Sequence, residues 1–126
     1  METLKINLME LRECPLEVAL PIGENGIERV VKVMFPSREQ EDTLSELQEK
    51  VRTTSDFKVI GDLCDQIAKI YLPELTDEDL QRLTRREVEQ VIAIVRMRLV
   101  KHLNDFFQKY GLNESQPKTT DTPTKN

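Results

Sequence analysis

The stretch LPELTDEDLQRLTRREVEQVIAIV, residues 72–95, places two helix starts eight residues apart and then opens a long apolar face. Thr76 can cap a short helix with an acidic first turn, where carboxylates interact favourably with the helix dipole. Thr84 and Glu87 have the spacing of a capping box, in which each side chain satisfies a backbone N–H at the helix start. The helix that begins there is predicted to run to Tyr110 and to be about 40 Å long. That length exceeds what a small core can cover.

Two more helices are predicted upstream of this stretch. Ser37 and Gln40 have capping-box spacing directly after a proline, so a helix is expected to begin here. Its narrow apolar stripe consists of Leu44, Leu47 and Val51. Thr54 or Ser55 can cap the next helix, whose broad apolar face indicates the centre of the core. That face comprises Phe57, Ile60, Leu63, Cys64, Ile67, Ala68 and Tyr71.

The N-terminal third is rich in β-branched residues and is predicted to form a β-hairpin. Residues 16–22 and 27–35 flank the sequence GENG, whose glycines can take positive φ in a tight turn. Pro21 lacks a backbone donor, so the first strand should lie at an edge or bulge at this point. Residues 4–8 alternate in the manner of a strand and could add a third one.

Together these elements predict an α+β fold that is predominantly α-helical. A small N-terminal β-hairpin of two or three strands precedes three to four helices, and the last helix is long. The chain has 126 residues, of which 38% are hydrophobic, so we expect a single domain over residues 1–112. Residues 113–126 contain no apolar side chain to offset the entropy of ordering, and they are predicted to form a disordered polar tail.

The composition predicts an acidic, soluble protein that acts in the cytoplasm. The formal net charge of −5 gives no overall attraction to nucleic acid or to an anionic membrane. No apolar run approaches the ~20 residues of a membrane span, and the N-terminus does not resemble a signal peptide. Cys14 and Cys64 lie in unrelated contexts, so both are expected to be reduced and unbridged.

No pattern of residues indicates catalysis, so we expect a protein that is not an enzyme and that has no cofactor and no metal site. His102, the single histidine, has only Asp105 and Arg98 at helical ligand spacing, so it is expected to be an ordinary, partly exposed side chain and not a ligand or base. Asp77, Glu78 and Asp79 lack the glycine or asparagine alternation of a calcium loop, and helix capping explains them.

An apolar stripe along the last helix is the first candidate binding surface. The stripe from Val88 to Leu99 is expected to complete the core, whereas the residues that follow lie beyond its reach. Exposed apolar clusters of this kind mark partner surfaces and favour self-association, so a protein partner or a homo-oligomer is expected here. The candidate protein-binding residues are Leu99, Leu103, Phe106, Phe107 and Tyr110.

A basic cluster is the second candidate surface. Arg82, Arg85 and Arg86 lie at the tight turn between two helices, which leaves a helix-turn-helix DNA-binding regulator as an alternative function. The acidic side chains of Glu87 and Glu89 would face DNA phosphates unfavourably, so nucleic acid is the less favoured partner.

A small extended N-terminal region followed by FKVIGDLCDQIAKIYLPELTDEDLQRLTRREVEQVIAIV resembles the tail assembly chaperones of long-tailed phages. The resemblance spans roughly residues 30–105. The positions that match the family's pattern are Leu75, Thr76, Leu80, Leu83, Thr84, Glu87 and Val91. The family has no catalytic residues to carry over.

This resemblance implies a protein of the host cell cytoplasm that coats the tape measure protein before and during polymerisation of the tail tube protein. It also implies a protein that is absent from the finished virion. Such chaperones are often made in two forms, the longer one by a ribosomal frameshift. The polar segment after Gly111 is where such an extension would attach.

Overall fold

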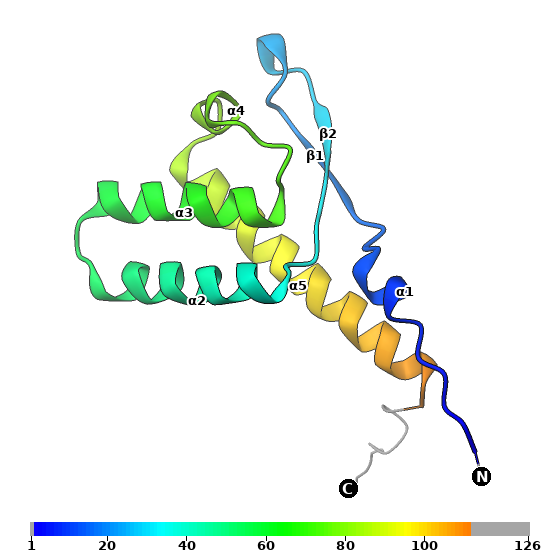
Figure 1. Cartoon of the computed structure of the whole chain (residues 1–126). Helices are drawn as coiled ribbons and strands as arrows, with labels where there is room; N and C mark the ends of the chain where they lie inside the picture. Colours follow the sequence, from blue (N-terminus) through cyan, green and yellow to red (C-terminus); the bar gives the residue numbers. More distant parts are fainter. Residues whose placement is uncertain (1, 112–126) are drawn as a thin grey trace, which may run out of the picture.

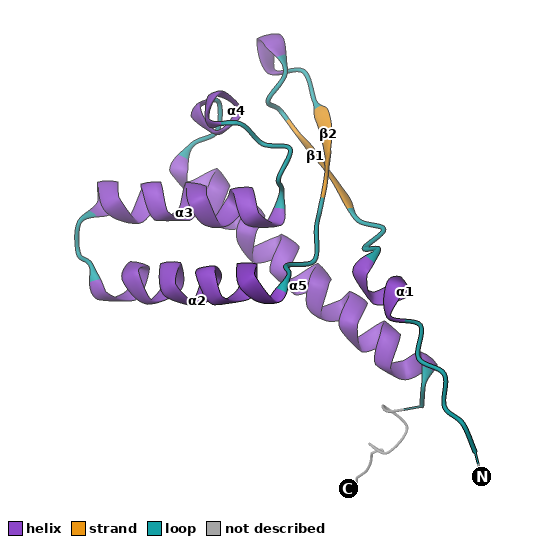
Figure 2. Ribbon diagram, in the orientation of Figure 1, coloured by secondary structure: helices purple, strands orange, loops and turns teal. Residues whose placement is uncertain are grey.

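The structure is a computed structural model that describes residues 2–111 (Figures 1 and 2). Within them the chain is α+β and predominantly helical, with a two-stranded N-terminal hairpin followed by four helices, the last one long, as predicted. The predicted polar tail lies outside the described residues. The elements are α1 (Leu8–Arg12), β1 (Glu17–Leu20), the 3-10 turn η1 (Glu24–Gly26), β2 (Arg29–Lys32), α2 (Arg38–Thr53), α3 (Phe57–Tyr71), α4 (Asp77–Gln81) and α5 (Arg85–Lys109).

The predicted hairpin is confirmed, with β1 and β2 antiparallel and Val18 opposite Val31. Its turn contains Asn25 and Gly26 at φ values of 57° and 76°, in the left-handed region that asparagine and glycine tolerate best. Pro21 follows directly after the last paired residue of β1. Its missing N–H donor therefore interrupts no ladder.

The third strand considered for residues 4–8 is wrong, because the chain before β1 forms the short helix α1 instead. The side chain of Asn7 accepts a hydrogen bond from the N–H of Met9 at 3.1 Å, which caps this helix. The cap gives the backbone a local partner that competes with an extended conformation. As Figure 1 shows, α1 lies beside the C-terminal end of α5.

Capping boxes open α2, α4 and α5 at the predicted residues Ser37, Thr76 and Thr84. In α3 the cap is Asp56 and neither of the two residues predicted for it. The Asp56 carboxylate accepts backbone N–H groups of the first turn, while the hydroxyl of Thr54 accepts the Asp56 N–H at 3.2 Å. A carboxylate also suits the positive end of the helix dipole, which favours aspartate here.

The helices α2 and α3 run antiparallel to each other, and the long α5 crosses α3 at an angle (Figure 2). Apolar side chains from the hairpin, from these three helices and from the connection around α4 meet in one core. The buried members are Leu20, Ile22, Val31, Val33, Leu44, Leu47, Leu63, Ile67, Ala68, Tyr71, Leu72, Leu75, Leu80, Val88, Ile92, Val95 and Leu99. The expectation that the stripe from Val88 to Leu99 completes the core is confirmed.

The broad apolar face of α3 is only partly buried, and its first member departs from the prediction. Phe57 is 83% exposed. It lies one turn before Gly61. The side chain of Arg85, at the start of α5, packs directly against Gly61, so that a Cβ added to Gly61 would lie 1.5 Å from the guanidinium. Phe57 therefore lies beyond the point where α5 begins to cover α3.

An ion pair between the exposed Arg29 and the buried Asp79 ties the hairpin to α4. Arg29 donates to the carboxylate of Asp79 at 2.5 Å, and Asp79, which is 5% exposed, also accepts the N–H of Thr76 at 3.0 Å. The pKa of Asp79 is lowered by the hydrogen bond from Arg29 and by those from Thr76, against the opposing effect of burial. A second link joins Arg82 to the carbonyl oxygen of Ile22 at 2.7 Å.

Candidate protein-binding groove

A groove with a volume of about 200 Å³ lies between the middle of α5 and the segment that joins β2 to α2. Two charged side chains, Glu41 and Arg96, contribute to its walls. The other lining residues are apolar or aromatic: Phe35, Pro36, Leu44, Tyr71, Leu99, Val100 and Leu103. Two of the residues predicted to bind a protein, Leu99 and Leu103, therefore lie in one site. The groove has the apolar character of a surface that binds another apolar group.

Local sequence explains how the groove forms. Pro36 ends the extended segment, and the cap at Ser37 starts α2 at once, so the chain turns sharply at Phe35 and Pro36. The N–H of Met34 donates to the carbonyl oxygen of Tyr71 at 2.8 Å, which fixes this turn to the end of α3. Tyr71 is buried, and burial raises the pKa of its hydroxyl.

An exposed apolar stripe on α5 continues the groove outward. Ile94, Met97 and Val100 are 58%, 71% and 56% exposed, and Val100 also lines the groove. The sequence prediction placed the partner surface further along the helix and missed this stripe. The signal was present, because the segment from Val91 to Val100 is apolar on almost every side, whereas a helix with one buried face needs only one apolar stripe.

The other three predicted residues lie apart from the groove, at the C-terminal end of α5. Phe106 is buried at 9% exposure, and its ring packs against those of Tyr110 and Phe107 at centroid distances of 5.1 and 6.2 Å. Phe107 and Tyr110 are half-buried. The prediction that this end of α5 lies beyond the reach of the core is therefore wrong for Phe106. The N-terminal segment, which was predicted to be extended, forms α1 and packs against this end of the helix.

Polar contacts hold α1 against this end of α5. The N–H of Asn7 donates to the hydroxyl of Tyr110 at 2.7 Å, and Lys109 forms an ion pair with Glu10 at 2.5 Å. His102 donates from Nε2 to the carbonyl oxygen of Leu11 at 3.1 Å. We call the segment of residues 2–13 the N-terminal arm.

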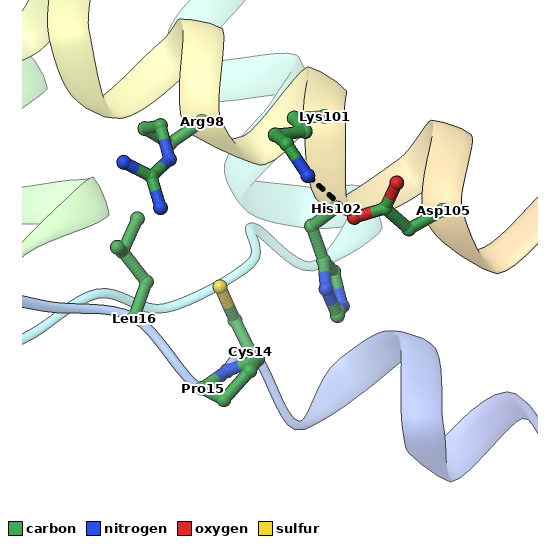
Figure 3. A pocket seen from close by; sticks show the side chains of 7 residues that line it. All are labelled: Cys14, Pro15, Leu16, Arg98, Lys101, His102 and Asp105. Atoms are coloured by element: carbon green, nitrogen blue, oxygen red, sulfur yellow. Dashed lines mark hydrogen bonds and ion pairs between the residues drawn. The ribbon is translucent and has the colours of Figure 1, made fainter.

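A smaller pocket of about 120 Å³ lies between the segment Cys14 to Leu16, which follows the arm, and α5, where Arg98 is among the lining residues (Figure 3). Cys14 directs its sulfur towards α5, and His102 lies nearby. His102 is already hydrogen-bonded to the carbonyl oxygen of Leu11 in the arm, and Lys101 is hydrogen-bonded to the carboxylate of Asp105. Burial raises the pKa of the Cys14 thiol, which disfavours the thiolate needed for nucleophilic chemistry. Both cysteines are free, as predicted, and within residues 2–111 no group of three or more His, Cys, Asp or Glu is placed to hold a metal ion.

The three arginines of the DNA-binding alternative do not form one surface for phosphates. Arg82 is engaged with the hairpin carbonyl described above, and Arg85 lies over Gly61 with Asp62 at 3.5 Å. Arg86 is exposed at the start of α5. Two of the three side chains thus serve contacts within the chain, so the geometry supports this alternative less than it supports a protein-binding groove.

None of the helices in the described part of the chain combines the length and the apolar character that a membrane span requires. Comparisons with protein-family models, with characterised proteins and with solved structures found no match to the chain.

Proposed function

We propose that the protein is a non-catalytic tail assembly chaperone of a long-tailed phage, which binds an apolar helix of the tape measure protein in the groove on α5. One observation carries this proposal: Val100 belongs both to the apolar groove and to the exposed stripe of Ile94, Met97 and Val100, so the two apolar features share a residue on α5. Monomeric proteins rarely leave such surfaces uncovered unless they bind a partner. The sequence resemblance to tail assembly chaperones supplies the identity of the partner.

Recognition of a helix in a groove suits this role. An extended helical client must have its apolar face shielded until assembly, and helix-in-groove contacts achieve this through anchors at every third or fourth residue. Several copies bound along one client would cover it in the host cytoplasm until the tail tube protein polymerises around it. Because each contact is small, each copy can leave as the tube grows.

Co-expression with the tape measure protein from the same genome tests this proposal. We expect the client to become soluble with the parent protein and to be lost from the soluble complex with Val100→Asp, because a charge in a desolvated contact is costly. Ile27→Asp is the matched control, since Ile27 is 64% exposed in the hairpin turn and Val100 is 56% exposed. We expect Val100→Asp to reduce client recovery at least roughly tenfold relative to the control.

Two results would contradict the proposal. The first is a client that stays insoluble with the parent protein. The second is equal client recovery with Val100→Asp and Ile27→Asp, which would show that the groove has no part in binding.

A further inference from the structure

The binding face of α5 is positively charged in a chain whose formal net charge is −5. Between Gln90 and Asn104 the sequence contains Arg96, Arg98 and Lys101 and no aspartate or glutamate. These three cations are exposed. The charge of this helix segment is therefore opposite to that of the protein as a whole, and it coincides with the uncovered apolar stripe.

The helical repeat places two of the cations along the edges of that stripe. At about 3.6 residues per turn, successive residues are separated by roughly 100° around the axis. Ile94, Met97 and Val100 then occupy one side of α5, with Arg96 beyond Val100 at one edge and Arg98 beyond Ile94 at the other. The stripe is thus an apolar strip bordered by guanidinium groups.

Neither border arginine forms an ion pair in the described part of the chain, although Arg98 also lines the small pocket and extends towards Leu16 (Figure 3). Lys101, in contrast, is paired with Asp105 at 3.0 Å. Arg96 also lines the groove, so one edge of the stripe and the groove share a cation. A guanidinium is weakly hydrated and binds carboxylates through two parallel hydrogen bonds, which suits the border of an apolar contact.

We propose that the helix bound here is an acidic amphipathic helix, with aspartate or glutamate flanking an apolar stripe of its own. This inference rests on the proposed function and specifies the chemistry of its partner. Apolar side chains at every third or fourth position would enter the groove and cover Met97 and Val100, and the flanking carboxylates would meet Arg96 and Arg98. The contact surface runs from Ile94 to Leu103, so about three turns of the partner are engaged.

Other occupants of this face fit its charges less well. A second copy of the chain that presented its own α5 would bring arginines against the same arginines, which like-charge repulsion opposes. DNA or an anionic bilayer would meet three cations on a chain that is acidic elsewhere, and repulsion from the remaining surface would oppose binding.

Two synthetic helical peptides of about 18 residues, roughly five turns, would test the charge selection. Both carry the same leucine stripe, and one has glutamate at the flanking positions where the other has lysine. We expect fluorescence anisotropy to show roughly tenfold tighter binding of the glutamate peptide at low salt, with the difference shrinking as salt is raised.

Charge reversal in the protein should reverse this preference. Arg96→Glu with Arg98→Glu should weaken the glutamate peptide roughly tenfold and favour the lysine peptide. The matched control is Lys58→Glu with Arg86→Glu, which makes the same change in net charge at exposed positions in the first turns of α3 and α5. This control should leave the preference unchanged, and circular dichroism should show the same helix content in both variants.

Each remaining outcome gives a definite answer. Equal binding of the two peptides, abolished for both by Val100→Asp, would overturn the charge selection while supporting the proposed groove. Binding of neither peptide would overturn both ideas. Phosphatidylserine vesicles and a short DNA duplex are tested in the same assay. If either bound as tightly as the glutamate peptide, and if the charge reversal at Arg96 and Arg98 abolished that binding, the face would recognise a polyanion and not an acidic helix.

Discussion

The two halves of α5 are held in place by different kinds of contact. The N-terminal half buries Val88, Ile92 and Val95 in the main core, and Leu99 just beyond the midpoint joins them. The C-terminal half contacts the N-terminal arm, where Phe106 is buried and the remaining contacts described are polar and lie near the surface.

This difference predicts unequal stability along a single helix. Full burial of an aliphatic side chain contributes about 1.5–3 kcal/mol, whereas an exposed ion pair contributes about 0–1 kcal/mol. The first half should therefore open only when the whole domain unfolds. The arm and the helix end should open locally and at lower cost, as weakly packed segments do. The groove residues that belong to the core, such as Leu99 and Tyr71, would then open only with the whole domain, while the arm opens locally.

Removal of apolar volume from the first half should have the largest effect. Ile92 is 7% exposed, so Ile92→Ala is expected to lower the free energy of unfolding by about 2–5 kcal/mol, through lost burial and a residual cavity. Ile94→Ala, in the exposed stripe of the same helix, is the matched control and should change it by less than about 0.5 kcal/mol. Urea denaturation measures both. Similar losses in the two variants would mean that the stripe is not a free surface.

Loss of the buried Asp79 carboxylate should have an intermediate effect on the free energy of unfolding, and comparison with an exposed carboxylate shows how much burial contributes. Asp79→Asn removes the charge that holds Arg29 and weakens the cap of α4, so we expect a loss of about 1–3 kcal/mol at neutral pH. Asp77→Asn is the control, because that carboxylate is 83% exposed and its pair with Lys69 contributes about 0–1 kcal/mol. Equal effects of the two substitutions would contradict this assignment.

The pH dependence of the same contact has a defined sign. Because the folded pKa of Asp79 is lowered, its contribution is fully present above the unfolded pKa and is lost as pH falls through the folded pKa. The difference in stability between the parent and Asp79→Asn should therefore shrink on acidification. A difference that stays constant down to strongly acidic pH would show that the ionised carboxylate is not what stabilises this junction.

Local signals in the sequence predicted most of the fold. Capping residues such as Ser37 and Thr84 act within one helical turn, and the GENG turn acts between neighbouring strands, so both can be read without knowing the rest of the structure. The N-terminal arm could not be read in this way. Its packing depends on contacts between Asn7 and Tyr110, and between Glu10 and Lys109, which join opposite ends of the chain.

The candidate groove was predicted only in part for a related reason. Leu99 and Leu103 belong to the apolar stripe of the last helix, and their spacing alone identified them. The groove beside them exists because Phe35, Pro36 and Tyr71 come from elements distant in sequence. Helix periodicity shows which residues of α5 share a face, but it does not show which face the core covers. The exposure of Met97 and Val100 was therefore found only in the structure.

The smallest effect is expected at the contact between the arm and the end of α5. Tyr110→Phe removes the acceptor for the N–H of Asn7, and Glu10→Gln removes the ion pair with Lys109. Because both contacts lie at the surface and water can replace the lost partners, the urea midpoint should not change measurably. Hydrogen exchange should still detect the change locally, with the amides of Asn7 and Glu13 exchanging about two- to fivefold faster.

Acidification should also weaken the contact between the arm and the end of α5. The pKa of Glu10 is lowered by its hydrogen bond with Lys109, so this contact is fully present above the unfolded pKa and weakens as pH falls through the folded value. The pKa of Lys109 is raised by Glu10, so the contact also weakens as pH rises through that folded value in the alkaline range. Exchange at Asn7 should therefore speed up at acidic pH relative to the intrinsic rate, while Val95 in the core stays protected. Arm amides as protected as those of the core would show that both halves of α5 belong to one cooperative unit.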